Sequence, residues 1–216
     1  MSLGLLGELA RLFVGTKLIK SSIDGIGVHL SRKTEIAELG EPKGKMKMKI
    51  YNVYTLEERM VHIIALANKG KLDPDVRKFV AKALTKRCGD DWCVSERDFD
   101  GEIVAIFNAV RRNVRYTGDI WSVDTFQHPK RTLELGIGDC DDVSILISSG
   151  LMSIGYPIRF RVIRTKGSND WNHIFVLCGR PPRDPKQWVS LDATVAKPAG
   201  WYPSKSLIAD TKDFAP

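Results

Sequence analysis

The sequence lacks any run of apolar residues approaching the roughly 18–20 that a membrane-spanning helix needs. Near the first residue there is no basic stretch ahead of an apolar run and no small-residue cleavage site, so we expect no secretory signal. Internal repeats and low-complexity tracts are also missing. These absences predict a chain that is made in the cytoplasm and stays soluble, unless an assembly carries it elsewhere.

The sequence also lacks a nucleic-acid-binding motif of known spacing, and its basic residues are not interleaved with aromatic ones as a stacking platform requires. The 33 Lys and Arg residues outnumber the 26 Asp and Glu residues, which gives a net charge of +7. Such a surplus permits contact with nucleic acid, an anionic cell wall or an acidic protein, but it specifies none of them. We therefore predict no specific nucleic-acid partner.

Cysteine is scarce. The chain of 216 residues has four, which is too few for a disulfide scaffold. Cys88 and Cys93 lie close together, and we expect them to be ordinary free thiols. A disulfide and a pair of metal ligands are the alternatives, although four intervening residues lie at the edge of zinc-ligand spacing. We predict no metal site and no cofactor.

What the sequence does have is a helical half followed by a half rich in strands. Thr55 opens a capping box, and Asp73 caps a helix with proline at its first position that we expect to end at Gly89. A third helix is predicted for Phe99–Val114. Alternating patterns then predict strands over 158–165, 172–178 and 187–192. This order favours an α+β fold with an antiparallel sheet packed on a helix.

The first 50 residues predict an arm. A short amphipathic helix is indicated by apolar residues at helical spacing, namely Leu5, Leu6, Leu9, Leu12 and Phe13. Glycine and proline then predict an irregular linker over 15–44, with one short strand near 27–30. Lysines alternate with apolar residues over 45–50, which indicates an edge strand whose lysines oppose aggregation. A basic ribbon that grips a partner is the alternative.

The most informative motif is Gly-Asp-Cys-Asp-Asp over 138–142. Apolar residues at helical spacing follow it, so Cys140 should be the first residue of a helix. A helix N-terminus lowers the pKa of a thiol and offers free N–H groups to an oxyanion. Three neighbouring carboxylates argue against a buried core cysteine and would themselves disfavour a thiolate. We expect Asp139 and Asp142 to serve as caps or loop anchors.

Cys140 is followed in the chain by the two residue types that a thiol nucleophile requires. His173 lies on a predicted strand and is the one histidine of four that follows the cysteine on such a strand. Asp192 ends the next predicted strand. A thiol needs a base to form thiolate at neutral pH, and the base needs a third group to fix its tautomer. The pattern predicts Cys140 as nucleophile, His173 as base and Asp192 as its orienting partner.

The stretch from Val114 to Thr194 resembles the transglutaminase-like superfamily, whose core holds a papain-type Cys-His-Asp arrangement. The resemblance is carried in order by Arg115-Tyr116, Pro129, Thr132-Leu133, Gly136, Gly138–Asp142, Gly155, Pro157, Arg159, His173, Trp188 and Leu191-Asp192. The chain is also similar to small transglutaminase-like proteins of tailed bacteriophages and prophages. That narrower likeness is carried by Gln127–Pro129, Asp192–Thr194 and Gly200–Pro203.

The resemblance implies acyl transfer through a cysteine thioester, with a protein or peptide as substrate. It assigns one oxyanion donor to the Cys140 N–H and a second to Gln127, with Trp121 and Tyr116 as competitors. Trp121 and Trp171 are candidates for the substrate groove. We expect hydrolysis, as in a cysteine protease or amidase, because a crosslinking enzyme must exclude water and this chain has few elements for a tunnel.

The chain is predicted to divide into an arm over 1–50, a helical subdomain over 51–98 and the catalytic core over 99–216. A structural role is the alternative to an enzyme: a virion or tail protein on the same fold, with a vestigial or single-use site. The arm over 1–50 would then bind a large assembly, and the protein would be virion-associated. Loss of assembly without the arm would favour this alternative.

Overall fold

The computed structural model describes residues 26–30, 38–39, 48–119 and 123–216. Within these ranges it contains five α-helices, which are numbered α2 to α6. The helices are α2 (Leu56–Gly70), α3 (Pro74–Leu84), α4 (Phe99–Asn113), α5 (Pro129–Leu135) and α6 (Cys140–Met152). None of the described helices is both long and apolar enough to cross a membrane.

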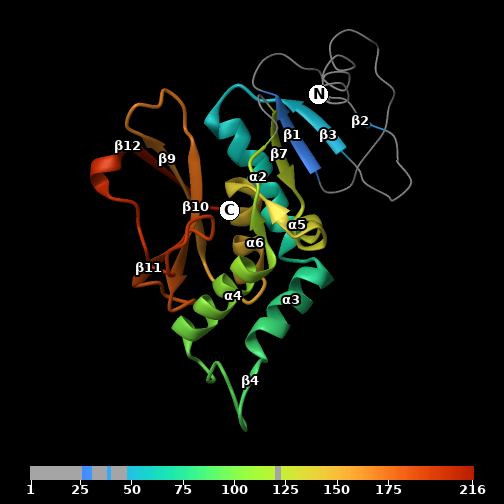
Figure 1. Ribbon diagram of the computed structural model, residues 1–216, viewed down its shortest axis with the longest axis vertical. Coiled ribbons are helices and arrows are strands. Elements are labelled where there is room, and N and C mark those ends of the chain that lie inside the picture. Colours follow the sequence, from blue (N-terminus) through green and yellow to red (C-terminus); the bar gives the residue numbers. More distant parts are fainter. Residues whose placement is uncertain (1–25, 31–37, 40–47, 120–122) are drawn as a thin grey trace, which may run out of the picture.

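The main sheet is antiparallel and lies in the C-terminal half. Its strand order is β11-β10-β9-β12. The strands are β9 (Ile158–Thr165), β10 (His173–Arg180), β11 (Gln187–Leu191) and β12 (Ile208–Phe214), the last preceded by the short 3-10 helix η1 (Lys205–Leu207). Figure 1 shows this sheet on one side of α6, which also contacts the helices α2, α3, α4 and α5. The α+β fold with a helix packed on an antiparallel sheet is confirmed.

A second sheet has the order β2-β3-β1-β7. It joins β1 (Ile26–Leu30), β2 (Glu38–Leu39) and β3 (Met48–Asn52) to β7 (Val123–Gln127), which lies far along the chain. Two short pairs complete the strands: β4 (Arg87–Cys88) with β5 (Asp91–Trp92), and β6 (Arg115–Tyr116) with β8 (Ile137–Gly138). Because β7 pairs with β1, the predicted arm and core share a sheet.

The predicted helix starts follow the local capping chemistry. The Thr55 hydroxyl accepts a hydrogen bond from the Glu58 N–H at 3.2 Å, and the Glu58 carboxylate accepts one from the Thr55 N–H at 3.1 Å, which makes a complete capping box. Asp73 caps α3 through the N–H of Asp75 at 2.8 Å. The predicted end of this helix at Gly89 is wrong, because α3 ends at Leu84 and the chain turns into the β4–β5 hairpin.

The expectation of free thiols at Cys88 and Cys93 is also wrong. The two residues form a disulfide that closes the exposed β4–β5 hairpin. Pairing fits the hairpin geometry, since β4 and β5 run antiparallel and bring the two ends of the six-residue segment together. The pairing also removes both sulfurs from any metal site.

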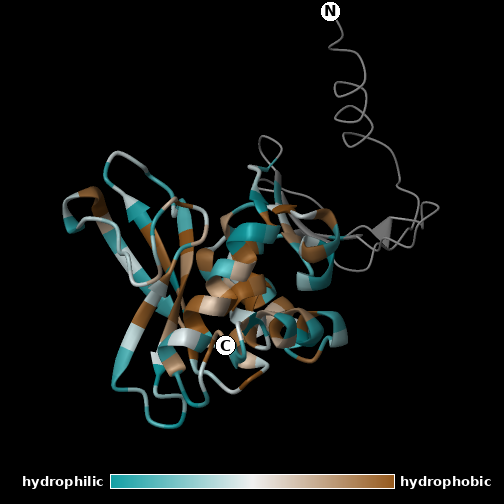
Figure 2. Ribbon diagram, turned by 60° about the horizontal axis from the view of Figure 1, so that its bottom comes forward, coloured by the Kyte–Doolittle hydropathy of each residue, from teal (hydrophilic) through white to brown (hydrophobic). Residues whose placement is uncertain are grey.

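Helix α6 lies at the centre of the hydrophobic core. Eleven consecutive residues, Asp141–Leu151, are buried, and the neighbours of the helix include α2, α4, α5 and β10. Figure 2 shows the hydrophobic segments gathered where α6 meets the sheet and the surrounding helices. The largest fully buried side chains include Phe107, Phe126 and Phe160, which come from three different elements. The same core cluster includes Met60 of α2 and Val80 of α3, so one core spans the predicted boundary at residue 98. The three-part division of the chain stays a prediction.

Alternation along β9 and β10 gives the main sheet two faces. Ile158, Phe160 and Val162 join the core against α6. The opposite face holds a smaller cluster of Ile163, Phe175 and Leu177, against which Trp188, Tyr202 and Ile208 pack. Sequence periodicity predicted this alternation, but it gave no indication of what covers the second face.

Several elements differ from the predictions. β7, α5 and β12 were not predicted. The edge position predicted for the lysine-rich strand is wrong, because β3 lies between β2 and β1 in the sheet. The reason is the short strand β2, which pairs Glu38 with Lys49 and so covers that side of β3. The predicted amphipathic helix over 5–13 lies outside the described residues.

Candidate active site

Local chemistry places Cys140 at the N-terminus of α6, as predicted. Asp139 is the N-cap, and its carboxylate accepts a hydrogen bond from the Asp142 N–H at 3.0 Å. Gly138 allows the close approach of this turn, because a Cβ added there would lie 2.7 Å from the Asp142 Cβ. The first residues of the motif thus shape the turn that presents the thiol at the helix end.

His173 and Asp192 form a hydrogen-bonded pair at the end of the main sheet. His173 is the first residue of β10 and Asp192 directly follows β11. The His173 Nε2 lies 2.7 Å from the Asp192 Oδ2, and the Asp192 side chain is 2% exposed. Thr194 fixes the other carboxylate oxygen through its N–H at 3.1 Å and its hydroxyl at 2.6 Å. The carboxylate therefore has a fixed orientation toward the imidazole.

The charge of Asp192 determines which nitrogen of His173 is available to a substrate. Burial opposes ionisation, but the hydrogen bonds and charge of His173 and the hydrogen bonds from Thr194 hold the Asp192 pKa below its ordinary value of 3.8. An ionised Asp192 accepts a proton from Nε2. Neutral His173 then carries its hydrogen on Nε2, and its Nδ1 has a free lone pair. This is the tautomer that a general base requires.

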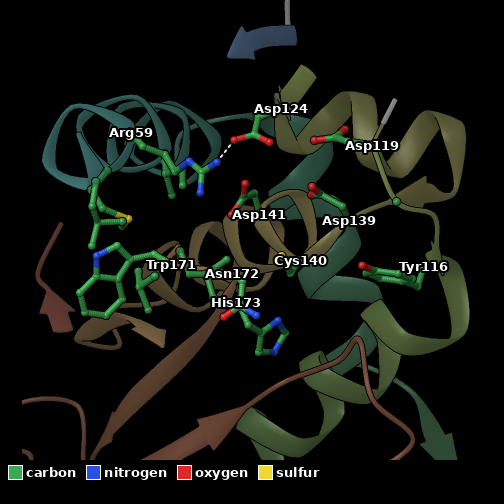
Figure 3. A pocket seen from close by; sticks show the side chains of 16 residues that line it. Arg59, Tyr116, Asp119, Asp124, Asp139, Cys140, Asp141, Trp171, Asn172 and His173 are labelled. Atoms are coloured by element: carbon green, nitrogen blue, oxygen red, sulfur yellow. Dashed lines mark ion pairs between the residues drawn. The ribbon is translucent and has the colours of Figure 1, made fainter. Parts of the chain in front are cut away.

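Cys140 and His173 line the same pocket, of about 190 Å³. Trp171 and Tyr116 line it as well, and so do four aspartates and Arg59. In the view of Figure 3, Asp139 and Asp141 lie on one side of Cys140 and His173 on the other. The pocket therefore brings together residues from α2, α6, β10 and the loops around residues 119 and 171.

The pocket disfavours a resting thiolate. Burial raises the pKa of the Cys140 thiol well above its ordinary value of 9.0, and the charges of Asp141 and Asp139 raise it further. A hydrogen bond from the Ile174 backbone and the charge of Arg59 oppose the rise without reversing it. Desolvation and the two carboxylates thus act against the lowering of this pKa that was expected from the helix N-terminus, and the carboxylates act in the direction that the sequence predicted.

The aspartates around the thiol are held in place by specific partners. Asp124 forms an ion pair with Arg59. Asp119 accepts a hydrogen bond from the Thr125 N–H at 2.8 Å and another from its hydroxyl. Burial and the neighbouring carboxylates raise the pKa of Asp139 above its ordinary value of 3.8. The site is therefore acidic and ordered, and a positive charge in it would be stabilised.

Gln127 lies next to this cluster but is directed at Asp142. Its backbone N–H donates to the Asp142 Oδ1 and its Nε2 to the Oδ2, both at 2.6 Å. The same Nε2 lies 3.4 Å from the Ile137 carbonyl oxygen. Asp142 thus anchors the segment before α5, as predicted for a loop anchor. The oxyanion role of Gln127 stays a prediction, and it would require the amide to leave these acceptors.

Of the two predicted groove residues, one belongs to the pocket as the structure describes it. Trp171 lines the pocket beside Cys140 and His173, whereas Trp121 lies outside the described residues. Tyr116, the competitor for the oxyanion role, also lines the pocket, and its pKa is raised by burial and by Cys140. Sequence reasoning missed Arg59, Asp119 and Asp124, because nothing local distinguishes them from surface charges.

The described residues contain no group of three or more His, Cys, Asp or Glu side chains arranged to hold a metal ion. Three of the four aspartates of the pocket have other partners: Asp124 pairs with Arg59, Asp119 accepts from the Thr125 N–H, and Asp139 accepts from the Asp142 N–H in the first turn of α6. The chemistry available in the pocket is that of a thiol, an imidazole, a phenol and carboxylates.

Residues 78–193 match the family model described as the transglutaminase-like superfamily, a range that includes Cys140, His173 and Asp192. A candidate cysteine protease from Cytophaga hutchinsonii has a similar fold, with 15% identity and a TM-score of 0.45 over 94% of this chain and 78% of that one. A candidate protease from Parabacteroides distasonis has 12% identity and a TM-score of 0.42 over 81% and 38%. Both are too distant to support an argument about the reaction. The chain matches none of the curated proteins.

Proposed function

Because the chain belongs to the transglutaminase-like superfamily, we propose that it is a thiol-dependent acyltransferase that acts on amide bonds of a protein or peptide, with hydrolysis as the outcome. The observation that carries this proposal is the pocket shared by Cys140, at the first turn of α6, and His173, whose Nε2 is bonded to Asp192. This arrangement supplies a nucleophile, a base with its tautomer fixed, and a partner for the imidazolium.

The proposed reaction begins with proton transfer from the Cys140 thiol to the His173 Nδ1. The sulfur attacks the substrate carbonyl carbon, and the resulting oxyanion takes hydrogen bonds from the Cys140 N–H and a second donor. Collapse breaks the carbon–nitrogen bond, and the imidazolium gives its proton to the leaving amine. A thioester remains on Cys140. Water, deprotonated by His173, then attacks the thioester and releases a carboxylic acid and the thiol.

Tyr116 is the better placed of the candidate second donors among the described residues. Its ring lines the pocket, Figure 3 draws its hydroxyl on the side of the ring toward Cys140, and it is 54% exposed and thus free to turn toward a substrate. The Gln127 amide is instead bonded to Asp142. The raised thiol pKa fits a nucleophile that is activated when the substrate arrives, since a substrate that displaces water strengthens the interaction between thiolate and imidazolium.

The test is alkylation of the full-length protein with iodoacetamide across about pH 5–9, with the modified cysteine mapped by mass spectrometry. A nucleophile paired with His173 should be alkylated at Cys140, and His173→Ala should slow this reaction. Cys178 serves as the internal control, because it is a free thiol that is buried in the core and does not line the pocket. If Cys140 reacts no faster than Cys178, or if His173→Ala has no effect, the proposal fails.

Acyl transfer to water and to an amine can be separated with the same protein. A glutamine-containing peptide offered with and without a primary amine should release ammonia in both cases if hydrolysis dominates. Incorporation of the amine at the expense of hydrolysis would instead indicate crosslinking. Cys140→Ala, which removes the nucleophile, should abolish either product.

The structural alternative rests on the N-terminal arm and on the narrower likeness to phage proteins. Most of the arm, including residues 1–25, lies outside the described residues, so virion association and assembly through 1–50 stay predictions. A chain lacking residues 1–25 would keep β1 in its sheet with β7. If that deletion abolishes association with an assembly and Cys140→Ala does not, a structural role is favoured.

A further inference from the structure

A second pocket, of about 550 Å³, shares no lining residue with the pocket around Cys140. It lies where the end of β11 and the loop after it meet β9, β10 and α4. Leu177 and Trp188 line it, and both pack in the cluster on the face of the main sheet away from α6. The pocket is therefore a separate hollow of the same sheet.

The charged residues of this pocket leave a positive surplus. Arg161 is paired with Asp213, with both nitrogen–oxygen distances at 2.6 Å, and Arg180 is paired with Asp100. Arg159 forms no ion pair within the described part of the chain. Its guanidinium is exposed and lies over the Trp188 ring, 4.2 Å from the centroid. Arg159 is thus a solvent-facing cation already positioned by an aromatic platform.

A second donor in the same pocket is buried without a partner. Ser190 lines the pocket, is 6% exposed, and its hydroxyl has no hydrogen-bond partner among the described residues. Buried polar groups in folded proteins are nearly always satisfied, so a lone hydroxyl indicates a group that binds there. The Nε of Arg180 is buried without a partner too. The Arg180 Nε–H can only donate and the Ser190 hydroxyl can donate, so a ligand with acceptor oxygens would satisfy both groups.

We propose that this pocket binds a carboxylate carried next to an aromatic or aliphatic side chain in a peptide. Arg159 pairs with the carboxylate, Trp188 and Leu177 contact the apolar part, and Ser190 donates a hydrogen bond. A carboxylate provides the several acceptor lone pairs that a guanidinium fork and a hydroxyl require. The proposal does not depend on the reaction at Cys140, because the two pockets have no residue in common.

The proposal is tested by titrating the full-length protein with N-acetyl-L-phenylalanine and, as the uncharged match, N-acetyl-L-phenylalaninamide. Binding is followed by the NMR signal of the Trp188 indole N–H, assigned with Trp188→Phe. We expect the acid to bind at least about tenfold more tightly than the amide. Arg159→Gln should weaken the acid about tenfold or more, and Ser190→Ala about threefold. The control is Arg164→Gln, which removes the same charge from the same strand. Arg164 pairs with Asp210 and lies outside the pocket.

A peptide carboxylate can come from a chain terminus or from an acidic side chain. N-acetyl-glutamyl-phenylalaninamide has only the second kind, so its affinity relative to N-acetyl-L-phenylalanine identifies the source. Equal binding of acid and amide, an unchanged affinity in Arg159→Gln, or no binding to the wild-type protein at about 20 mM would each overturn the proposal. Iodoacetamide alkylation of Cys140 at the wild-type rate checks that each variant is folded.

Discussion

Replacing Gln127 with methionine tests how the segment before α5 is attached to the site. Methionine has a similar length and fills the same buried space but cannot donate a hydrogen bond. The substitution removes the 2.6 Å bond from Nε2 to the Asp142 Oδ2 and keeps the bond from the backbone N–H to Oδ1. Because Asp142 is 1% exposed, water cannot replace the lost donor.

The cost of Gln127→Met should depend on pH. Burial raises the pKa of Asp142 above its ordinary value of 3.8, and the two donors of Gln127 oppose that rise. The side-chain donor stabilises the carboxylate more than the neutral acid, so its loss raises the pKa of folded Asp142 further. The folded variant then binds a proton more tightly than the wild type. Its stability therefore continues to fall with pH where that of the wild type levels off, near and above the pKa of about 8 of folded Asp142.

A neutral hydrogen bond contributes about 1 kcal/mol and one to a charged group up to about 3 kcal/mol. We therefore expect Gln127→Met to lower the free energy of unfolding by about 1 kcal/mol near pH 5 and by an amount that grows toward about 3 kcal/mol near pH 9. Each kcal/mol corresponds to about 2–4 °C in melting temperature. The assay is urea unfolding at both pH values. In the Asp142→Asn background the pH dependence should disappear. A loss that is the same at both pH values would refute the argument.

The same variant tests the predicted oxyanion role. If Gln127 only anchors Asp142, Gln127→Met should acylate Cys140 with p-nitrophenyl acetate at close to the wild-type rate, measured at a temperature where both proteins are folded. Loss of an oxyanion donor typically costs about 3–4 kcal/mol in the transition state, or at least a hundredfold in rate. Tyr116→Phe is the matched comparison, since it removes one hydroxyl from the pocket and should give that larger loss.

Three further outcomes are expected. Asp141→Asn removes a charge that raises the Cys140 pKa. Alkylation of Cys140 by iodoacetamide near pH 7 should therefore be about tenfold faster. An unchanged rate would contradict the assigned cause. The pKa of folded Asp192 lies below 3.8, so ionised Asp192 stabilises the fold above pH 3.8, and this stabilisation is lost as pH falls through the folded pKa. Asp192→Asn should therefore lose less unfolding free energy than the wild type between about pH 5 and pH 2. Equal losses in urea titrations would count against the pairing with His173. The double substitution Cys88→Ser with Cys93→Ser opens a short exposed loop and should lower the free energy of unfolding in urea by at most about 2 kcal/mol. The alkylation rate of Cys140 should not change. A slower rate would connect the hairpin to the site.

The helix starts and the sheet alternation could be predicted from the sequence because both depend on neighbours a few residues apart. Thr55, Asp73 and Asp139 accept hydrogen bonds from N–H groups two or three residues ahead, so a short stretch of sequence contains the whole cap. The alternation of β9 follows from the two-residue period of a strand. The candidate nucleophile, base and orienting aspartate were indicated in the same way, by residue type on a predicted element.

What the sequence could not supply was set by contacts between distant segments. The raised pKa of Cys140 depends on its burial and on the charges that surround it, and a sequence shows charges without their distances or the dielectric between them. The pairing of β7 with β1, and of β12 with β9, joins segments that have no local reason to meet. The sequence alone thus determined which residues could perform chemistry and where the helices begin, because those properties are local. Only the tertiary structure decided which charges surround the thiol, that Gln127 is bonded to Asp142, and that the outer sheet face has a basic pocket, because each of these is set by the packing of elements far apart in the chain.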